Sequence, residues 1–184
     1  MLEIGREWRY DLFDLAIEMP PPLAERPVRA EVEERIDAAG NVLQKLEISK
    51  VDSIASEFKK RGVQSIGVCL LHAYQNNNHE IAIRDRLNKI APEISVSLSS
   101  IVSAEMGEYE RSSTTAVNAY VMPRVASYLT ALQKKLIDMG LKAKLLMLQS
   151  NGGAASLDQL ILSLIHISEP TRRTPISYAV FCLK

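Results

Sequence analysis

The sequence predicts an α/β fold in which a parallel or mixed sheet is flanked by helices. Residues 49–98 alternate between helical and buried-strand patterns in the order helix, strand, helix, strand. Residues 28–46 alternate apolar and polar side chains on both sides of Gly40, which is typical of a β-hairpin near the N-terminus. Hydrophobic residues make up 47% of the 184 residues, which is enough to fill a core.

The composition argues against several classes of partner. The chain has 22 basic and 22 acidic residues without a basic stripe, so nucleic acid is not an expected partner. No apolar run is long enough to span a membrane, and the first residues lack the apolar core of a signal peptide. Cys69 and Cys182 do not form a disulfide framework, which favours a reduced, cytoplasmic compartment.

The N-terminal part begins with residues 5–19, which show neither a helical nor a strand period. Pro20, Pro21 and Pro22 predict a stiff, extended connector, with an SH3-type ligand as the alternative. In the hairpin, Gly40 supplies the freedom to take a positive φ at the turn. Four acidic residues of the first strand could suggest a metal site, but their spacing favours a solvated strand face. They are Glu31, Glu33, Glu34 and Asp37.

The middle of the chain contains two helix–strand pairs. A helix is expected from Ser49 or Lys50 through Arg61, ended by Gly62, because apolar residues recur there at helical spacing. Residues 65–71 are typical of a buried parallel strand. A second helix is expected over residues 79–90 with Asn78 as its cap, followed by a strand over residues 94–98.

Polar side chains follow both of these strands. His72 comes at the end of the first strand, and Ser99 and Ser100 come at the end of the second. In open α/β sheets, ligands collect outside the carboxyl ends of the strands, so these residues occupy a suitable place. His72, with Tyr74 and His79 nearby, could act as a base or a ligand, but a structural role is favoured because two histidines do not make a metal site.

The last third of the chain predicts more helix and a third strand. Residues 106–118 are compatible with a helix, and residues 121–139 predict an amphipathic helix with Pro123 near its start and Gly140 at its end. Residues 144–148 are typical of another buried strand, and a tight turn is expected after it. Residues 154–161 are too short to assign.

Two clusters could carry chemistry. In residues 108–118, hydroxyl, amide and guanidinium donors could hold a carbonyl or carboxylate, and three of them recur at helical spacing on one face. The alternative, which the local pattern favours, is an N-cap cluster at Ser112 or Ser113 with a helix that begins at Thr114. The candidate residues of this cluster are Arg111, Thr114, Thr115 and Asn118.

The second cluster is the turn of Ser150, Asn151, Gly152 and Gly153, whose backbone N–H groups could approach an anion. An ordinary turn is the alternative, and it is favoured by the residue types alone. No Walker-type loop, dinucleotide fingerprint or Cys-x-x-Cys motif occurs, and no metal ligand set is predicted.

Residues 162–184 resemble the in-frame translation of a sequencing-library adapter, with Arg173, Thr174 and Pro175 where such adapters carry a variable index. The alternative is a natural Ser/Thr/Pro-rich tail with a short strand over residues 176–183. On the adapter interpretation, the natural chain continues beyond residue 161 in another sequence, and His166 and Cys182 have no functional weight.

Several short motifs fall in an order that resembles the hydantoinase A / 5-oxoprolinase family. A proline segment and a hairpin follow Arg9-Tyr10-Asp11-Leu12, and a helix start follows the strand that ends in His72-Ala73-Tyr74. Further matches are Glu110-Arg111-Ser112-Ser113-Thr114-Thr115, Asn118-Ala119-Tyr120 and Gln149-Ser150-Asn151-Gly152-Gly153. The resemblance covers about residues 5–158.

This resemblance implies part of an actin-like or sugar-kinase-like ATPase fold, with its phosphate-binding loops outside these residues. It implies that residues 1–117 end the family's N-terminal domain and that residues 118–161 begin the next, with the junction near Thr115–Tyr120. The implied activity is ATP-dependent opening of a small cyclic amide or imide with ATP and Mg²⁺, beside a hydantoinase B-type subunit or a fused equivalent. The alternatives are a subunit of a related ATP-dependent ketone carboxylase and a non-catalytic α/β interaction module.

Overall fold

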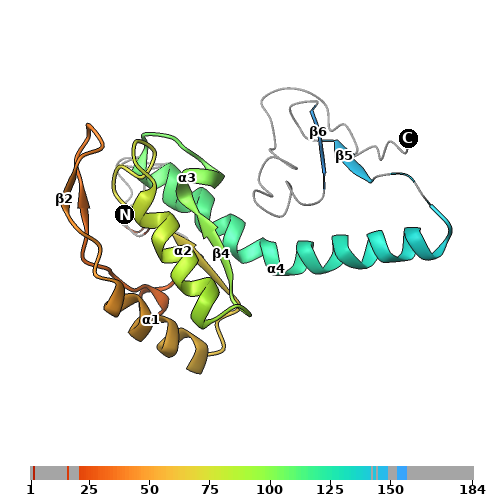
Figure 1. Ribbon diagram of the computed structural model, residues 1–184, viewed down its shortest axis with the longest axis horizontal. Helices are drawn as coiled ribbons and strands as arrows, with labels where there is room; N and C mark the ends of the chain where they lie inside the picture. Colours follow the sequence, from red (N-terminus) through yellow and green to blue (C-terminus); the bar gives the residue numbers. More distant parts are fainter. Residues whose placement is uncertain are drawn as a thin grey trace.

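The computed structural model describes residues 2, 16, 21–141, 143, 145–148 and 153–156. Within these residues, an α/β unit is built on two parallel strands, and a long helix leads from it to a second, antiparallel strand pair (Figure 1). The predicted α/β class is therefore confirmed. No helix in this described part combines the length and apolarity needed to span a bilayer.

The expected hairpin is present but shorter than predicted. Strand β1 (Arg35–Ile36) pairs with β2 (Val42–Gln44) in antiparallel orientation, and Gly40 in the turn has φ +87°. Val28 ends a single 3₁₀ turn, η1 (Arg26–Val28), instead of starting a strand. Pro27 explains this difference, because its fixed φ and missing N–H suit the first turn of a helix.

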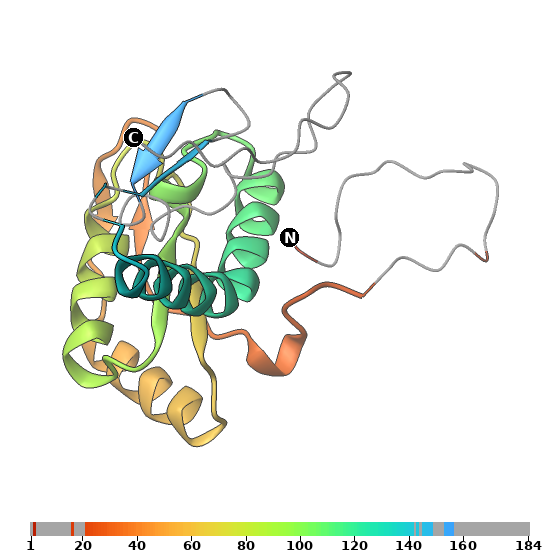
Figure 2. The same cartoon turned by 90° about the vertical axis from the view of Figure 1, so that its right-hand side faces the viewer.

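The α/β unit follows the predicted order. Helix α1 (Ile48–Lys60) leads to β3 (Ser65–Val68), and helix α2 (Asn78–Ile90) leads to β4 (Ser95–Leu98). The two strands are parallel, with Ser65 opposite Ser95. Helices α1 and α2 lie on one face of the strands, as Figures 1 and 2 show. Their buried side chains form the larger core with the strands: Val51, Ala55, Phe58, Ile66, Val68, Ile83, Leu87, Ala91, Ile94 and Leu98.

Glycine and asparagine residues lie at the helix ends of this unit. Gly62 has φ +71° and follows Arg61, the C-cap of α1, so it ends the helix as the sequence predicts. Asn78, which was expected to cap α2, is instead its first residue. The N-cap is Asn77, which makes no side-chain cap hydrogen bond, while the side-chain oxygen of Asn76 accepts a hydrogen bond from the N–H of Asn78 at 3.1 Å.

One continuous helix replaces the two expected helical segments. After the short helix α3 (Ser99–Val102), helix α4 (Glu108–Asp138) runs for 31 residues, and its first half covers the other face of β3 and β4. Pro123 is therefore in the helix interior, where it removes one backbone hydrogen bond, and not near a helix start. The expected junction near Thr115–Tyr120 lies inside this helix.

A second, smaller core forms at the far half of α4. Strand β5 (Leu146–Leu148) pairs with β6 (Ala154–Ser156) in antiparallel orientation. Leu129 of α4 packs there with Leu145, Met147 and Ala155. The predicted third strand therefore exists, but it does not join the β3–β4 sheet, because its partner is the next segment of the chain.

Candidate functional site

The carboxyl ends of β3 and β4 meet at one edge of the α/β unit, as the parallel topology requires. The loop after β3 contains Leu70, His72 and Tyr74, while α3 begins at Ser99 directly after β4. Figure 1 shows α3 close to the start of α4 at this edge. The sequence predicted that His72, Ser99 and Ser100 follow the ends of two strands. In the structure, one side chain contacts both of these strand ends.

Glu80, in the first turn of α2, is the centre of this edge, a role that was not predicted for it. Its side chain is fully buried, and its carboxylate accepts four hydrogen bonds. One oxygen accepts from the N–H of Leu70 at 3.0 Å and from the hydroxyl of Ser99 at 2.6 Å. The other accepts from the N–H of Ser100 at 2.9 Å and from its hydroxyl at 2.7 Å. The donors supply what a buried carboxylate needs, so Glu80 ties the two strand ends together.

Arg111 holds the same loop from the side of α4. Its guanidinium donates to the carbonyl of Leu70 at 2.9 Å and to the carbonyl of Glu105 at 2.8 Å. It also lies 5.5 Å from the centre of the Tyr74 ring, in a cation–π arrangement. Only 1% of Arg111 is exposed, and its Nε has no hydrogen-bond partner. The position suits a residue that orders the loop by contacts within the protein.

The predicted shared face of Arg111, Thr115 and Asn118 is confirmed, because all three are buried against β3 and β4. Thr115 donates to the carbonyl of Arg111 at 2.7 Å, and Asn118 donates to the hydroxyl of Ser97 at 3.0 Å. Thr114 does not share this face and is half-buried. The favoured N-cap alternative is wrong in its position, because α4 begins at Glu108 with Gly107 as the N-cap.

His72 has a backbone conformation that is uncommon for its type. Its φ is +56°, in the left-handed region, and it is the one residue other than glycine with a positive φ among the described residues. The ring is half-buried, and its Nδ1 lies 3.3 Å from the hydroxyl of Tyr74. A non-glycine residue held in this region is a candidate for a functional role, since the conformation has an energetic cost.

The hairpin is fastened to α2 by a buried pair. The Nδ1 of His79 lies 2.7 Å from a carboxylate oxygen of Glu34, and their side chains are 11% and 5% exposed. The interpretation of Glu34 as part of a solvated face was therefore wrong, although Glu31 and Glu33 are exposed as expected. The error arose because β1 spans only two residues, so strand alternation does not apply at position 34.

Of the second candidate cluster, Ser150, Asn151 and Gly152 lie outside the described residues. Gly153 is exposed and directly precedes β6. Strands β5 and β6, which lie before and after this cluster in the sequence, pair in antiparallel orientation. In the part of the chain that the structure describes, no three His, Cys, Asp or Glu side chains come together as a metal site.

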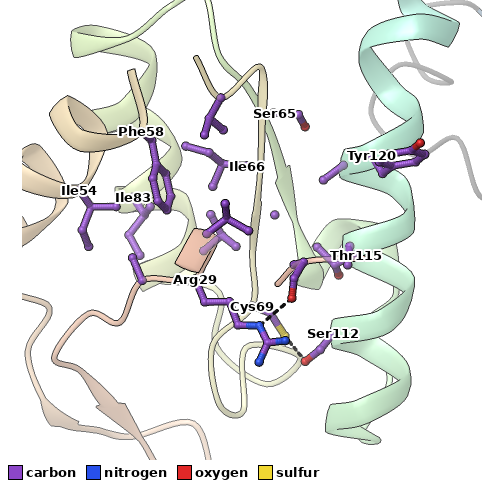
Figure 3. Close-up of a pocket in the computed structure, with 18 of the residues that line it drawn as sticks. Arg29, Ile54, Phe58, Ser65, Ile66, Cys69, Ile83, Ser112, Thr115 and Tyr120 are labelled. Atoms are coloured by element: carbon purple, nitrogen blue, oxygen red, sulfur yellow. Dashed lines mark hydrogen bonds between the residues drawn. The ribbon is translucent and has the colours of Figure 1, made fainter. Parts of the chain in front are cut away.

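A cavity of about 960 Å³ lies along β3, on the side away from β4. Figure 3 shows Ile54, Phe58 and Ile83 on one side of it, from α1 and α2. Thr115 and Tyr120 of α4 lie on the other side, and Cys69 contacts Ser112 at 3.1 Å between sulfur and oxygen. The cavity is thus a slot between two helical layers, and Leu70, which donates to Glu80, is among the residues that line it.

Comparison with known proteins gives consistent matches. The hydantoinase/oxoprolinase N-terminal region matches residues 1–91, and the hydantoinase/oxoprolinase model matches residues 111–170. An uncharacterised protein of Methanocaldococcus jannaschii is 38% identical over 85% of this chain and 23% of its own length. The acetophenone carboxylase gamma subunit of Aromatoleum aromaticum is 32% identical over 75% of this chain and 20% of its own length. 5-Oxoprolinase 1 of Arabidopsis thaliana is 29% identical over 84% of this chain and 14% of its own length.

Two solved structures share the fold. The ATP-dependent caprolactamase of Pseudomonas jessenii superposes with a TM-score of 0.72 at 25% identity, over 85% of this chain and 23% of its own. A nucleotide-free acetone carboxylase superposes with a TM-score of 0.61 at 23% identity, over 73% of this chain and 20% of its own. The chain therefore spans about a fifth of the length of the relatives that it matches.

Proposed function

This chain belongs to the hydantoinase/oxoprolinase family, and on that premise we propose that it is part of an ATP-dependent hydrolase that opens a small cyclic amide or imide. The observation that carries the proposal is the match of both family regions in order along one chain. The relatives named 5-oxoprolinase and caprolactamase support the choice of a cyclic amide as substrate.

The chemistry requires that a poor electrophile, the amide carbonyl, be activated before water attacks it. ATP, with Mg²⁺ to neutralise phosphate charge, would supply the phosphoryl group for this activation. The described residues do not fit such a group, because they offer no cluster of metal-ligating side chains and the sequence has no phosphate loop of known pattern. We therefore assign no step of nucleotide chemistry to this chain.

The contribution of this chain is positional. Arg111 contacts the loop after β3, Thr115 bonds to the backbone of α4, and Asn118 bonds to Ser97 of β4. We therefore propose that all three have a positioning role and do not touch substrate. Thr114 and His72 are half-buried, and with Ser150–Gly153 they remain proposed contacts to a ligand. His72 is the stronger of these, because its backbone conformation is otherwise unexplained.

A ketone carboxylase is the second candidate function. The acetophenone carboxylase subunit is more similar in sequence to this chain, at 32% identity, than the plant 5-oxoprolinase, at 29%. Both enzymes would use the same scaffold, since the solved relatives named for carboxylation and for lactam hydrolysis both share its fold. The substrate therefore decides between the two candidates.

The proposal also covers the partner subunit, the division into domains and the location of the protein. A hydantoinase B-type subunit, or a fused equivalent, is the proposed partner, and residues 1–117 and 118–161 are the proposed division between domains. A cytoplasmic location is proposed as well, supported by Cys69, which is free and half-buried. A non-catalytic interaction module is the rival interpretation for these residues.

The test is an assay of the protein in its longest natural form, purified together with its B-type subunit. ADP release should depend on a cyclic amide, with 5-oxoproline, hydantoin and caprolactam as the first substrates, and should match ring opening in amount. Bicarbonate fixation that requires acetone or acetophenone would establish the carboxylase instead. If the complex is stable but releases no ADP with any of these substrates, the result would contradict both the hydrolase and the carboxylase and favour the interaction module.

A further inference from the structure

His72 has one ring nitrogen with a partner and one without. Its Nδ1 lies 3.3 Å from the hydroxyl of Tyr74, and the two rings meet edge to face with 5.9 Å between their centres. Its Nε2 has no hydrogen-bond partner in the part of the chain that the structure describes. The hydroxyls of Ser99 and Ser100, at the end of β4, both donate to Glu80. Of the three polar residues predicted at the strand ends, His72 therefore keeps a ring nitrogen for a ligand.

The contact with Tyr74 decides which nitrogen of His72 carries the proton. A neutral imidazole has one N–H donor and one bare nitrogen that accepts, and the hydrogen bond at one nitrogen sets the state of the other. The bare nitrogen is a much stronger base than a phenol oxygen, so the favourable arrangement is the one in which the Tyr74 hydroxyl donates to Nδ1. The proton of the neutral ring then lies on Nε2.

Arg111 favours the same arrangement from the side of α4. Its guanidinium lies 5.5 Å from the centre of the Tyr74 ring, and only 1% of the residue is exposed, so solvent screens its charge little. A positive charge beside a phenol polarises it, which makes the O–H a stronger donor and the oxygen a weaker acceptor. The same guanidinium is fixed by two backbone carbonyls. Helix α4 thus orients Tyr74, and Tyr74 orients His72.

We propose that His72 binds an acceptor oxygen of the ligand through its Nε2–H, and that Tyr74 is the positioning residue that keeps the proton on Nε2. The identity of the ligand rests on the function proposed above, and on that basis the acceptor is the carbonyl oxygen of the cyclic amide. A donor at this oxygen stabilises the negative charge that develops when water attacks the carbonyl carbon. His72 is therefore a hydrogen-bond donor and not a general base. Its φ of +56°, which costs energy, is then the conformation that holds the ring toward the ligand.

The ring nitrogen-15 chemical shifts of the 184-residue chain test the proton position without any assay of activity. At a pH where the imidazole is neutral, His72 should be protonated at Nε2 and bare at Nδ1. His79 is the internal control with a protonated Nδ1, because the Glu34 carboxylate 2.7 Å away can only accept. Tyr74→Phe keeps the ring beside Arg111 and removes the hydroxyl, so His72 should become a mixture of tautomers. A parent ring protonated at Nδ1, or a tautomer that Tyr74→Phe leaves unchanged, would overturn the proposal.

Activity of the longest natural form with its B-type subunit tests the role of the donor. His72→Gln places an amide N–H close to the position of Nε2 but cannot act as a base. His72→Ala should lower kcat/KM for the cyclic amide by about 100-fold, whereas His72→Gln should recover roughly 10-fold of this loss. Tyr74→Phe should lower kcat/KM by roughly 10-fold with an unchanged urea midpoint. Tyr128→Phe, at a 60% exposed position of α4, should change neither quantity.

Two outcomes of the assay would overturn the proposal. An equal loss in His72→Gln and His72→Ala would assign a base, and a loss confined to the KM for ATP would assign the donor to a phosphate oxygen. Absence of any cyclic-amide turnover by the parent would remove the proposed function and the carbonyl acceptor with it. The nitrogen-15 shifts would still decide the position of the proton, so the two failures are distinguishable.

Discussion

Glu80 and Arg111 hold Leu70 from its two sides: Glu80 accepts from the N–H at 3.0 Å, and Arg111 donates to the carbonyl at 2.9 Å. Both charged side chains are buried, and they come from different helices, α2 and α4. The loop after β3 is therefore fixed at one residue by two opposite charges. The first two predictions remove these contacts one at a time.

Replacing Glu80 should destabilise the chain even when the shape of the side chain is kept. In Glu80→Gln, one carboxylate oxygen becomes an NH₂ group, and each oxygen faces one backbone N–H that can only donate. We expect a loss of roughly 2–3 kcal/mol in the free energy of unfolding, measured by urea denaturation. The matched control is Glu57→Gln, because Glu57 is exposed and pairs with Arg61 at the surface. Equal effects of the two variants would refute the role given to Glu80.

Arg111→Lys should be destabilising although it keeps the charge. A lysine ammonium lacks the planar fork that reaches the carbonyls of Leu70 and Glu105 together. The expected loss is roughly 2–4 kcal/mol, again from urea denaturation, because a buried charge loses part of its hydrogen bonding. Arg124→Lys, at an exposed position of the same helix, should have no measurable effect. In the active longer form, an increase in KM without loss of stability would show instead that Arg111 binds ligand.

Gly67 marks a close approach of β3 to α4. A Cβ at this position would lie 3.3 Å from the Cγ2 of Thr115 and 3.6 Å from the Cβ of Ala119. Gly67→Val should therefore cost roughly 1–3 kcal/mol through overpacking. Adding Thr115→Ser removes the Cγ2 methyl and keeps the hydroxyl that bonds to Arg111, so it should recover part of the loss. A double-mutant cycle measures this coupling, and strictly additive effects would contradict the contact.

His72 should be replaceable by glycine without loss of stability. Its φ of +56° costs a non-glycine residue energy, and glycine adopts it freely. We expect His72→Gly to change the midpoint of thermal unfolding little or to raise it, although the contact with Tyr74 is lost. In the longer form, the proposed ligand role predicts that this variant loses turnover. His72→Asn, which also tolerates the left-handed region, is the control, and full activity of both variants would exclude the role.

The pair of Asp52 and Arg86 should make stability depend on pH. Two contacts of 2.6 Å join them across α1 and α2, and this hydrogen bonding to Arg86 holds the pKa of Asp52 below its ordinary value. A lowered pKa contributes stability above the unfolded-state pKa, and the contribution disappears as the pH falls through the folded-state pKa. Asp52→Asn should thus be slightly less stable than the parent at neutral pH and equal to it in strong acid. A pH-independent difference, in urea melts across this range, would point to a cause other than charge.

The parts of the fold that the sequence could predict are those encoded locally. Gly40, Gly62 and Gly140 all have positive φ at turns or helix ends, and the apolar stripe of α1 faces the core. Such positions are set by backbone sterics and by a period of a few residues. Predicting these positions does not require knowing which residues pack against them.

What could not be predicted depends on contacts between distant residues. Glu80 looks like an ordinary acidic residue in a first helical turn, and its burial depends on donors 10, 19 and 20 positions away. Helical spacing predicted that Arg111, Thr115 and Asn118 share a face, but it did not show that this face is turned into the protein. The pairing of β5 was missed for a different reason: its partner β6 is close in sequence but lies in residues 154–161, which were too short to assign.

Helix α4 has a mechanical consequence. Pro123 lies inside it, and Figures 1 and 2 show that the helix changes direction between its first half, which packs on β3 and β4, and its second half, which packs in the smaller core. Arg111, Thr115 and Asn118 clamp the near end, whereas the far end carries the β5–β6 pair. Residues 124–138, about 22 Å of helix, therefore form an arm: a tilt of about 10° at Pro123 would move the far end by roughly 4 Å.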